Sequence, residues 1–332
     1  MKKISIITDK FYHKNRLFDE LDRISNRDKC LSGFILLKKH LLEFDIDLCT
    51  NDIHIPESSD LVIYTDMNQY NGCVKAKKLA ILFESAVVSP KNWEMEKHKY
   101  VDLIFTWNDD FIDNKKYFKV NFVTNFDQIF DHTEAERKNF CCAIAGNKFS
   151  NHPNETYSIR KRYIKEFQKL DSGFHLYGNG WDRIPLKILN RFKVPKTILK
   201  LLNSDYSNSY KGNIDSKYSV LKNYNFSLCI ENAQELNGYI TEKIFDCMVA
   251  GAIPIYHGAP NIKEYVPADC FIDVGSFSNP EKCYQYLKNL KLNELVDFRK
   301  NISRFIQSEK RDPFTPEHFA STIGNKIISL LC

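Results

Sequence analysis

The feature that most constrains this fold is an alternation between short apolar runs and longer stretches with helical periodicity. In the first third of the chain, five apolar runs predict strands at 4–8, 46–50, 61–65, 79–83 and 103–107. Helical patterns lie between them, the clearest at 31–44. Alternating strands and helices are typical of parallel sheets with helices on both faces.

The alternation pauses after residue 122 and resumes beyond a polar stretch at 124–138. The second part predicts strands at 140–144, 174–177, 226–230, 253–256 and 270–274, and helices at 157–170, 240–250, 294–307 and 318–331. We therefore expect an α/β protein of two Rossmann-like, doubly wound domains, 1–135 and 136–332. Ligands of such sheets bind at the carboxyl ends of the strands, here in the cleft between the domains.

Composition excludes several classes of protein. A net charge of +5 over 332 residues is far below what a nucleic-acid-binding protein carries, so no nucleic-acid partner is expected. No run of 18 apolar residues occurs, and the N-terminus turns polar too early for a signal peptide. The ten cysteines form no C-x-x-C pair and mostly stand in apolar runs. Buried reduced thiols predict a reducing compartment, the cytoplasm.

Several catalytic motifs are absent, namely G-x-G-x-x-G, the Walker loop, H-E-x-x-H and G-x-S-x-G. Asp45-Ile46-Asp47 forms a D-x-D, a pattern that some sugar transferases use to hold a divalent metal. A solvated turn before a strand is the preferred interpretation, and we predict no metal-ligating residue.

The most informative segment is 226–260. A buried strand ends in Glu231-Asn232, a polar loop with Gly238 follows, and a helix opens around Tyr239 to Lys243. The free N–H groups of a first helical turn attract anions. Lys243 opposes the helix dipole, which makes sense if an anion such as a diphosphate binds beside it. The alternative is a capped structural helix with a surface lysine.

This segment strongly resembles the donor-binding core of the α-1,3/α-1,4-fucosyltransferases, glycosyltransferase family 10. That family shows F-x-L-x-F/I-E-N, a short loop, Y-I/V-T-E-K-I/L and A-G-x-I/V-P-I/V-x-x-G, and nearly every position matches. A second match is Glu84-Ser85-Ala86, similar to the family's E-S-P motif with alanine in place of proline, followed by the strand end at 104–110. A looser match covers 177–183. The resemblance spans about 79–320, and the first 78 residues match little.

The resemblance implies an inverting GT-B glycosyltransferase of bacterial or viral type that transfers fucose from GDP-fucose. Glu84 would be the general base, with Asp109 and Asp110 as the alternative carboxylates. The C-terminal domain would bind the donor through residues with separate roles. Lys243 and Arg183 would hold phosphate, Glu242 the ribose, and Asn232 and Tyr239 would line the nucleotide-sugar pocket. No metal is needed to neutralise the leaving group, although a divalent cation could add to that effect.

An insertion-like stretch, 184–202, weakens the assignment of Arg183, because Lys211 or Lys217 could take its role. The stretch carries five basic residues and no acid, with apolar residues interleaved. Such an element suits a peripheral contact with anionic lipid or a lipid-linked glycan acceptor, and a solvated surface helix is the alternative. The expected linkage is α-1,3 to GlcNAc or glucose of a lipopolysaccharide-type glycan. Two other functions stay open, namely transfer of another GDP-deoxysugar and an inactive glycan-binding protein.

Overall fold

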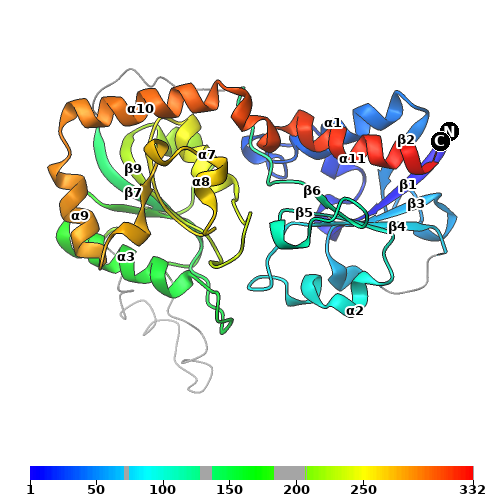
Figure 1. The fold of residues 1–332 in the computed structure, drawn as a ribbon, viewed down its shortest axis with the longest axis horizontal. Helices are drawn as coiled ribbons and strands as arrows, with labels where there is room; N and C mark the ends of the chain where they lie inside the picture. Colours follow the sequence, from blue (N-terminus) through cyan, green and yellow to red (C-terminus); the bar gives the residue numbers. More distant parts are fainter. Residues whose placement is uncertain (71–74, 128–136, 183–205, 207, 332) are drawn as a thin grey trace.

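The computed structural model describes residues 1–332 except 71–74, 128–136, 183–205, 207 and 332. Its described strands form two parallel sheets, one in each half of the chain (Figure 1). The first sheet has the order β2-β1-β3-β4-β5-β6. Its strands are β1 (Lys2–Ile7), β2 (Ile46–Thr50), β3 (Leu61–Tyr64), β4 (Lys77–Leu82), β5 (Leu103–Thr106) and β6 (Tyr117–Lys119).

The central strands are buried on both faces, which explains why they read as continuous apolar runs. Every residue of β3 and of β5 is buried. One face of the sheet packs on α1 (Ser32–Leu42) and α11 (Pro316–Leu331), in a cluster that includes Ile4, Ile63 and Ile81. The opposite face buries Val62, Tyr64 and Leu82 in a smaller cluster.

The expectation of full helices between these strands was wrong for much of the first half. Only α1 separates β1 from β2, and α2 (Met95–His98), between β4 and β5, is four residues long. Short 3₁₀ turns stand at 56–58 and 67–69 in the other two connections. The described residues of these two connections are mostly polar, and a second large helix on this sheet comes from the end of the chain.

That second helix is α11, at the place predicted for 318–331. Its Phe319, Ile323 and Ile327 are buried in the cluster of the first sheet, beside α1 (Figure 1). The last helix therefore packs with the N-terminal half, although the domain limits 1–135 and 136–332 assign it to the other. The boundary at 135 lies outside the described residues, and the division remains a proposal.

The second sheet has the order β11-β10-β9-β7-β8. Helices α3 and α10 lie on opposite sides of it (Figure 1). The strands are β7 (Asn139–Ile144), β8 (His175–Tyr177), β9 (Tyr224–Ile230), β10 (Ile253–His257) and β11 (Ile272–Asp273). The helices are α3 (Tyr157–Leu170), α6 (Lys217–Leu221), α7 (Glu242–Val249), α8 (Ile262–Tyr265), α9 (Pro280–Asn289) and α10 (Leu292–Ile306).

The chain passes between the halves near 121–127 and again near 309–316, where the two passages contact each other. The Thr124 amide donates to the Phe314 carbonyl at 2.9 Å, and Asn121 Nδ2 donates to the Pro313 carbonyl at 3.2 Å. The Phe314 ring packs on Phe245 of α7, with 4.3 Å between centroids. Both passages are thus tied to the helix that carries the predicted donor residues. Within the described residues, no helix is long and apolar enough to cross a membrane.

Candidate active site

Glu84 stands in the turn that follows β4, at the carboxyl edge of the first sheet. Two indole groups fix this turn. Trp93 Nε1 donates to the Glu84 carbonyl at 2.9 Å, and Trp107 Nε1 donates to the Phe83 carbonyl at 2.6 Å. The backbone is thereby held while the carboxylate stays available, because no described residue forms a hydrogen bond with it.

Burial raises the pKa of Glu84, and the charge of Lys243 gives the largest opposing effect, followed by Lys148. The charges of Glu242 and Asp66 raise it further. Lys243, Lys148 and Glu242 belong to the other half of the chain. Glu84 is therefore close enough to the start of α7, in the other half of the chain, to be affected by its charges. A carboxylate with a raised pKa in such a place is a stronger base than one in water.

Glu231, which follows β9, organises the start of α7. The sequence analysis had not assigned it a role. Its side chain is fully buried. It accepts from the Thr241 amide at 2.8 Å, the Thr241 hydroxyl at 2.7 Å and Lys243 Nζ at 3.1 Å. Arg160 of α3 donates to the Glu231 carbonyl at 2.7 Å. This network fixes the N-cap Thr241 and the direction of Lys243 together.

Lys243 and Glu242 have different hydrogen-bond partners, although Lys243 Nζ also lies 4.0 Å from Glu242 Oε1. Lys243 Nζ donates to Glu231 and, at 2.8 Å, to the Thr241 hydroxyl. Lys217 Nζ lies 3.2 Å from Glu242 Oε1 and 2.6 Å from Asp246 Oδ2. Burial would raise the pKa of Glu242, but Lys217 and Lys243 together hold it well below the usual value.

Asn232 and Tyr239, both predicted to line the nucleotide-sugar pocket, have different neighbours in the structure. Asn232 Oδ1 accepts from Arg160 Nη2 at 3.1 Å, beside the Glu231 network. The Tyr239 side chain is buried, and its ring packs edge-on against Trp107 with centroids 4.7 Å apart. Tyr239 therefore contributes its ring to the contact between the halves, and a role in the donor pocket stays a prediction.

The neighbouring loop after β5 is locked to the other half of the chain by Asp109. This carboxylate accepts from Lys119 Nζ at 2.5 Å, Tyr265 OH at 2.7 Å and Asn261 Nδ2 at 2.9 Å. The alternative that Asp109 acts as the base is therefore unfavourable, because hydrogen bonds from these three donors outweigh burial and lower its pKa.

Gly238 makes the close approach of the two loops possible. A Cβ at this position would lie 2.3 Å from the Trp107 carbonyl oxygen and 2.7 Å from Asp109 Oδ2, and its φ is +79°. Only glycine fits there without displacement of the backbone.

A cavity of about 720 Å³ opens at the carboxyl ends of β7 and β8. Its lining includes the backbone turns 144–148 and 178–180, with Lys148, Asp182 and Lys217 around them and Arg27 from the N-terminal half. Gly178 has φ +115°, and a Cβ there would lie 2.3 Å from the Ala145 carbonyl oxygen. Gly178 thus lets the ends of β7 and β8 approach each other and leaves space for a ligand in the cavity beside them.

Two of the predicted donor-binding residues are not placed at this cavity. Arg183 lies outside the described residues. Lys211 is exposed and is absent from the lining of the cavity, and its amide donates to the Leu176 carbonyl at 2.8 Å. Lys217, which the sequence offered as an alternative, does line it.

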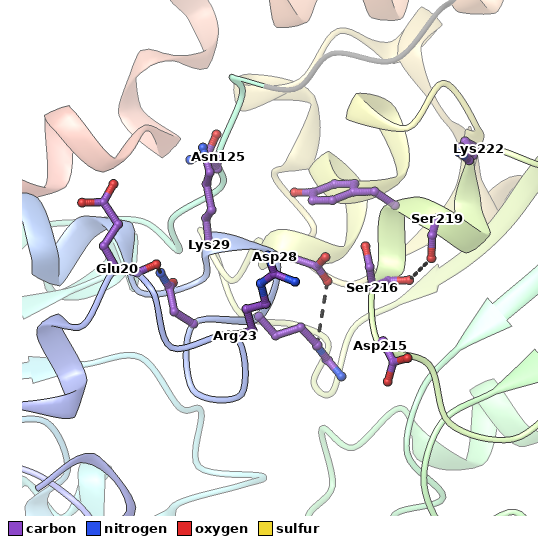
Figure 2. A pocket seen from close by; sticks show the side chains of 12 residues that line it. Glu20, Arg23, Asp28, Lys29, Asn125, Asp215, Ser216, Ser219 and Lys222 are labelled. Carbon is purple, nitrogen blue, oxygen red and sulfur yellow. Dashed lines mark hydrogen bonds and ion pairs between the residues drawn. The ribbon is translucent and has the colours of Figure 1, made fainter.

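A second cavity, of about 400 Å³, also has Arg27 in its lining and is walled by both halves of the chain (Figure 2). Glu20, Arg23, Asp28 and Lys29 come from the N-terminal half, and Asp215 to Lys222 supply the facing wall. Acids and bases alternate around it, so it has no strong preference for a charged ligand.

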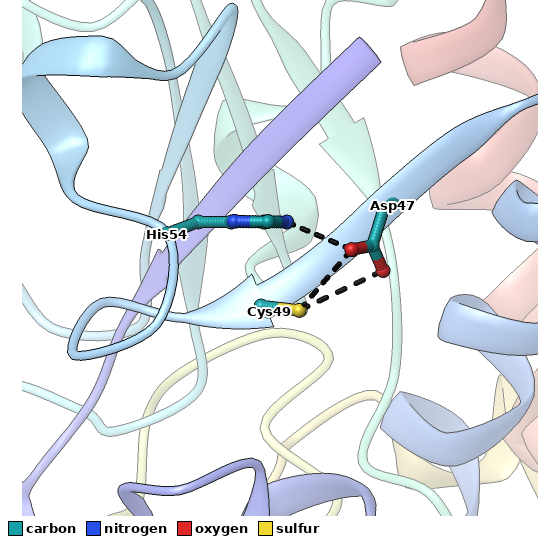
Figure 3. Close-up of side chains that lie close together, drawn as sticks. All are labelled: Asp47, Cys49 and His54. Atoms are coloured by element: carbon teal, nitrogen blue, oxygen red, sulfur yellow. Dashed lines mark hydrogen bonds and ion pairs between the residues drawn. The ribbon is translucent and has the colours of Figure 1, made fainter. Parts of the chain in front are cut away.

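A cluster of Asp47, Cys49 and His54 lies at the edge strand β2 (Figure 3). His54 Nε2 lies 2.8 Å from Asp47 Oδ2, and the Cys49 thiol lies 3.5 Å from the same oxygen. Lys38 Nζ donates to Asp47 Oδ1 at 2.8 Å, so an ammonium already supplies the positive charge that a metal would bring. Asp47 of the D-x-D is accounted for by these contacts.

Sequence reasoning missed Glu231, Arg160 and Arg27. Glu231 belongs to the E-N pair that ends a strand and matches the family motif, but only Asn232 of that pair was given a role. Arg160 and Arg27 gave no local signal, because an arginine in a helix and one in a polar loop are both ordinary. Their roles come from contacts across 71 residues in the first case and 187 in the second.

The family model for the C-terminal part of glycosyltransferase family 10 (fucosyltransferase) matches residues 134–300, about half of the chain. Over 114 residues, the chain is 36% identical to the GDP-fucose protein O-fucosyltransferase 3 of Xenopus tropicalis. Over 78 residues, it is 38% identical to the α-(1,3)-fucosyltransferase FucT of Helicobacter pylori. These alignments cover 34% and 24% of this chain, but only 23% and 16% of the relatives' own lengths.

The fold agrees with this family. A crystal structure of an α1,3-fucosyltransferase with GDP matches with a TM-score of 0.56 and 16% identity, over 99% of this chain and 90% of that one. The α/β architecture of two Rossmann-like domains facing a cleft, predicted as GT-B, is confirmed. The chain belongs to glycosyltransferase family 10, the fucosyltransferase family.

Proposed function

We propose that this chain is an inverting fucosyltransferase that moves L-fucose from GDP-fucose to a hydroxyl of a glycan acceptor. Membership of family 10 supports the reaction class. The observation that carries the proposal is the pair of opposed groups at the junction of the halves. On one side stands Glu84, without a hydrogen-bond partner among the described residues. On the other stands the start of α7, whose Lys243 acts on Glu84 electrostatically.

In the proposed reaction, the acceptor hydroxyl attacks C1 of fucose while Glu84 accepts its proton. The bond between C1 and the β-phosphate oxygen breaks, and GDP leaves from the opposite face, which inverts the anomeric centre. Negative charge grows on the β-phosphate during this step, and a fixed cation stabilises it. Lys243 carries three N–H donors, of which Glu231 and Thr241 engage two. The third can donate to phosphate without breaking the network.

The donor is proposed to occupy the 720 Å³ cavity and the space between it and α7. That volume is within the range of small-molecule sites. Lys148 and Lys217 bring positive charge to its walls. The predicted roles of Glu242 at the ribose, of Asn232 and Tyr239 in the pocket and of Arg183 or Lys211 at phosphate remain part of this proposal. No residue is assigned to a metal, and a divalent cation is proposed as a stimulator at most.

The acceptor is proposed to be a GlcNAc or glucose residue of a lipopolysaccharide-type or lipid-linked glycan, to which fucose is joined in α-1,3 linkage. The relative from Helicobacter pylori, an α-(1,3)-fucosyltransferase, supports that linkage. The relative from Xenopus tropicalis is named for a protein acceptor, so the acceptor class has to be measured. A screen of N-acetyllactosamine-type glycans and folded peptides with GDP-fucose separates the two.

Lys243→Ala tests the donor site. We expect GDP affinity to fall by about 1.5–3 kcal/mol in calorimetry, the scale of a charge-assisted hydrogen bond. The variant also leaves the buried Glu231 carboxylate without its cation, so stability should fall as well.

The double variant Lys243→Ala/Glu231→Gln separates the two effects. It should recover melting temperature and keep the loss of GDP affinity. Recovery of GDP binding in the double variant would show that Lys243 acts only as a structural partner of Glu231, and parental GDP affinity in Lys243→Ala would remove it from the donor site.

A cytoplasmic location at the inner face of the membrane is also proposed. All described cysteines are free, and seven of the eight are buried, which suits a reducing compartment. The basic stretch 184–202 lies outside the described residues, and its lipid contact rests on its sequence. Co-sedimentation with anionic vesicles at low salt, reversed at high salt, is the expected result. Equal behaviour with neutral vesicles would exclude the contact.

A further inference from the structure

The loop between Asp19 and Leu31 belongs to the N-terminal half but contacts the wall of the donor cavity. Asp28 Oδ2 accepts from the Lys217 amide at 3.0 Å, and Arg27 Nη1 donates to the Ile214 carbonyl at 3.4 Å. Ile214 and Lys217 both line the 720 Å³ cavity. The loop therefore sits directly against the segment that forms one side of the proposed nucleotide site.

This loop is held in an unusual backbone conformation. Asp28 and Lys29 have φ of 54° and 58°, two consecutive left-handed residues that are not glycine. Such conformations are unfavourable for residues other than glycine and persist where the surroundings fix them. Asn26 supplies part of that support, because its Oδ1 accepts from the Leu31 amide at 3.0 Å and its Nδ2 donates to the Glu20 carbonyl. The conformation presents Arg27 to the other half of the chain.

Arg27 is the residue that lines both cavities between the halves. Its side chain is 47% exposed, and its ion pair with Asp28 is long, at 3.8 Å. A guanidinium has five N–H donors, and the Ile214 carbonyl takes one of them at the limit of hydrogen-bond distance. Most of its donors are therefore available to a ligand.

The charges around the 720 Å³ cavity show what Arg27 adds. The other cations in its lining are Lys148 and Lys217, and the acid is Asp182. The Lys217 ammonium is already paired with Glu242 and Asp246. Lys148 acts on Glu84. Arg27 is thus a cation that comes from the opposite half of the chain and lines this cavity. Its contacts with the Ile214 carbonyl and with Asp28 are both weak.

We propose that Arg27 binds the diphosphate of the donor from the N-terminal half, so that the nucleotide is held from both sides of the cleft. The inference rests on the proposed function, since it takes GDP-fucose as the ligand. Arginine suits this task, because its planar fork can donate two parallel hydrogen bonds to one phosphate. Binding of the diphosphate by residues of both halves would also stabilise the closed arrangement of the cleft.

The test compares Arg27→Ala, Arg27→Lys and Arg23→Ala in the full chain, by calorimetry with GDP and with guanosine. Arg23 is a matched control, because it is an exposed arginine of the same loop that lines the 400 Å³ cavity but not the larger one. We expect Arg27→Ala to weaken GDP tenfold or more and guanosine less than twofold. Arg27→Lys should weaken GDP by a smaller factor, and Arg23→Ala should change neither ligand by more than twofold.

Three results would overturn the inference, and they differ in meaning. Parental GDP affinity in Arg27→Ala would remove Arg27 from the site and leave the proposed function intact. Equal loss of GDP and guanosine affinity in Arg27→Ala would show that Arg27 only supports the loop. A parent chain that turns over no GDP-fucose and binds no GDP would overturn the proposed function together with this inference. A melting curve for each variant identifies any that is unfolded, and Arg27→Lys, which keeps the charge, then decides.

Discussion

Two carboxylates follow neighbouring strands of the same sheet, and their surroundings are opposite. Asp109, after β5, accepts hydrogen bonds from Lys119, Tyr265 and Asn261. Glu84, after β4, has none from the described residues, although Trp93 holds its backbone carbonyl and Trp107 holds that of Phe83. Both stand at the junction with the other half of the chain, so position alone does not distinguish them.

The difference in partners produces opposite shifts of pKa. Burial alone would raise the pKa of both groups. In Asp109 the hydrogen bonds from Lys119, Asn261 and Tyr265 outweigh burial and lower the pKa, whereas in Glu84 burial prevails and raises it. Asp109, which accepts three hydrogen bonds, holds two loops together, whereas Glu84, without such donors, can accept a proton. The comparison therefore separates a structural acid from a candidate base on physical grounds.

The largest effect is expected for Glu84→Gln. The amide keeps the shape of the side chain but is a far weaker base, so kcat should fall by about 10²–10⁴, the usual contribution of general-base assistance. GDP affinity should change by less than about 0.5 kcal/mol, because no contact with the donor is lost. Steady-state kinetics at saturating acceptor, with calorimetry of GDP, measures both quantities.

Asp110→Asn is the matched control for that experiment. Asp110 is exposed in the loop after β5, and its Oδ1 accepts from Asn237 at 3.0 Å, an interaction that asparagine can keep. Its kcat should stay within about threefold of the parent, as for an exposed side chain. Near-parental kcat for Glu84→Gln at saturating acceptor would end the assignment of Glu84 as the base.

Asp109→Asn should have a smaller effect, and on stability first. The amide cannot accept from all three donors, and the partly buried Lys119 loses its opposite charge. We expect the free energy of unfolding to fall by about 1–3 kcal/mol, with kcat reduced less than tenfold. Chemical denaturation with activity assays tests this. A loss of kcat as large as that of Glu84→Gln, at unchanged stability, would reverse the two roles.

The smallest effect is a difference in pH dependence with opposite signs. The folded-state pKa of Glu84 is raised, so its contribution to stability is present below the unfolded value of about 4.3 and is lost as pH rises. The folded-state pKa of Asp109 is lowered, so its contribution is present above about 3.9 and is lost as pH falls. Relative to the parent at pH 7, Glu84→Gln should therefore melt slightly higher and Asp109→Asn lower.

Thermal melting between pH 4 and pH 8 measures these differences, which should be on the order of 1–3 °C. Glu84→Gln should converge on the parent toward pH 4, whereas Asp109→Asn should still melt below the parent at pH 4 and converge only at lower pH. Equal shifts of the same sign in both variants would show that the two carboxylates do not differ in the folded protein, and the comparison would fail.

Much of the C-terminal half was predictable from local sequence. The helix at 157–170 has the limits that were predicted for it. The strand predicted at 226–230 ends as predicted and begins earlier, at Tyr224. Buried parallel strands appear as continuous apolar runs, and a helix with one apolar stripe shows a period of 3.6. In the N-terminal half the strand at 46–50 has the predicted limits as well. The three-residue β6 was missed, because so short a segment carries too little pattern.

The candidate site was predictable only in part. Lys243, Glu242 and Glu84 were found because they stand in dense motifs that resemble family 10, and the roles assigned to them remain predictions. Tyr239 was expected to line a pocket, a role that stays a prediction, and the contact of its ring with Trp107 was not foreseen. Glu231 was seen in the sequence without its function as the partner of Lys243. Local sequence records the type of residue and its secondary structure but not its partners.

By itself, the sequence determined the fold class, the positions of the main strands along the chain and the segment that resembles a donor site. Each depends on patterns within a few dozen residues. Tertiary structure alone decided which carboxylate accepts three hydrogen bonds and that the last helix packs beside α1. It also decided that Arg27, from the N-terminal half, lines the 720 Å³ cavity. The physical reason is that these features depend on contacts between segments far apart in the chain. Asp109 meets Tyr265 across 156 residues, and no local pattern encodes that meeting.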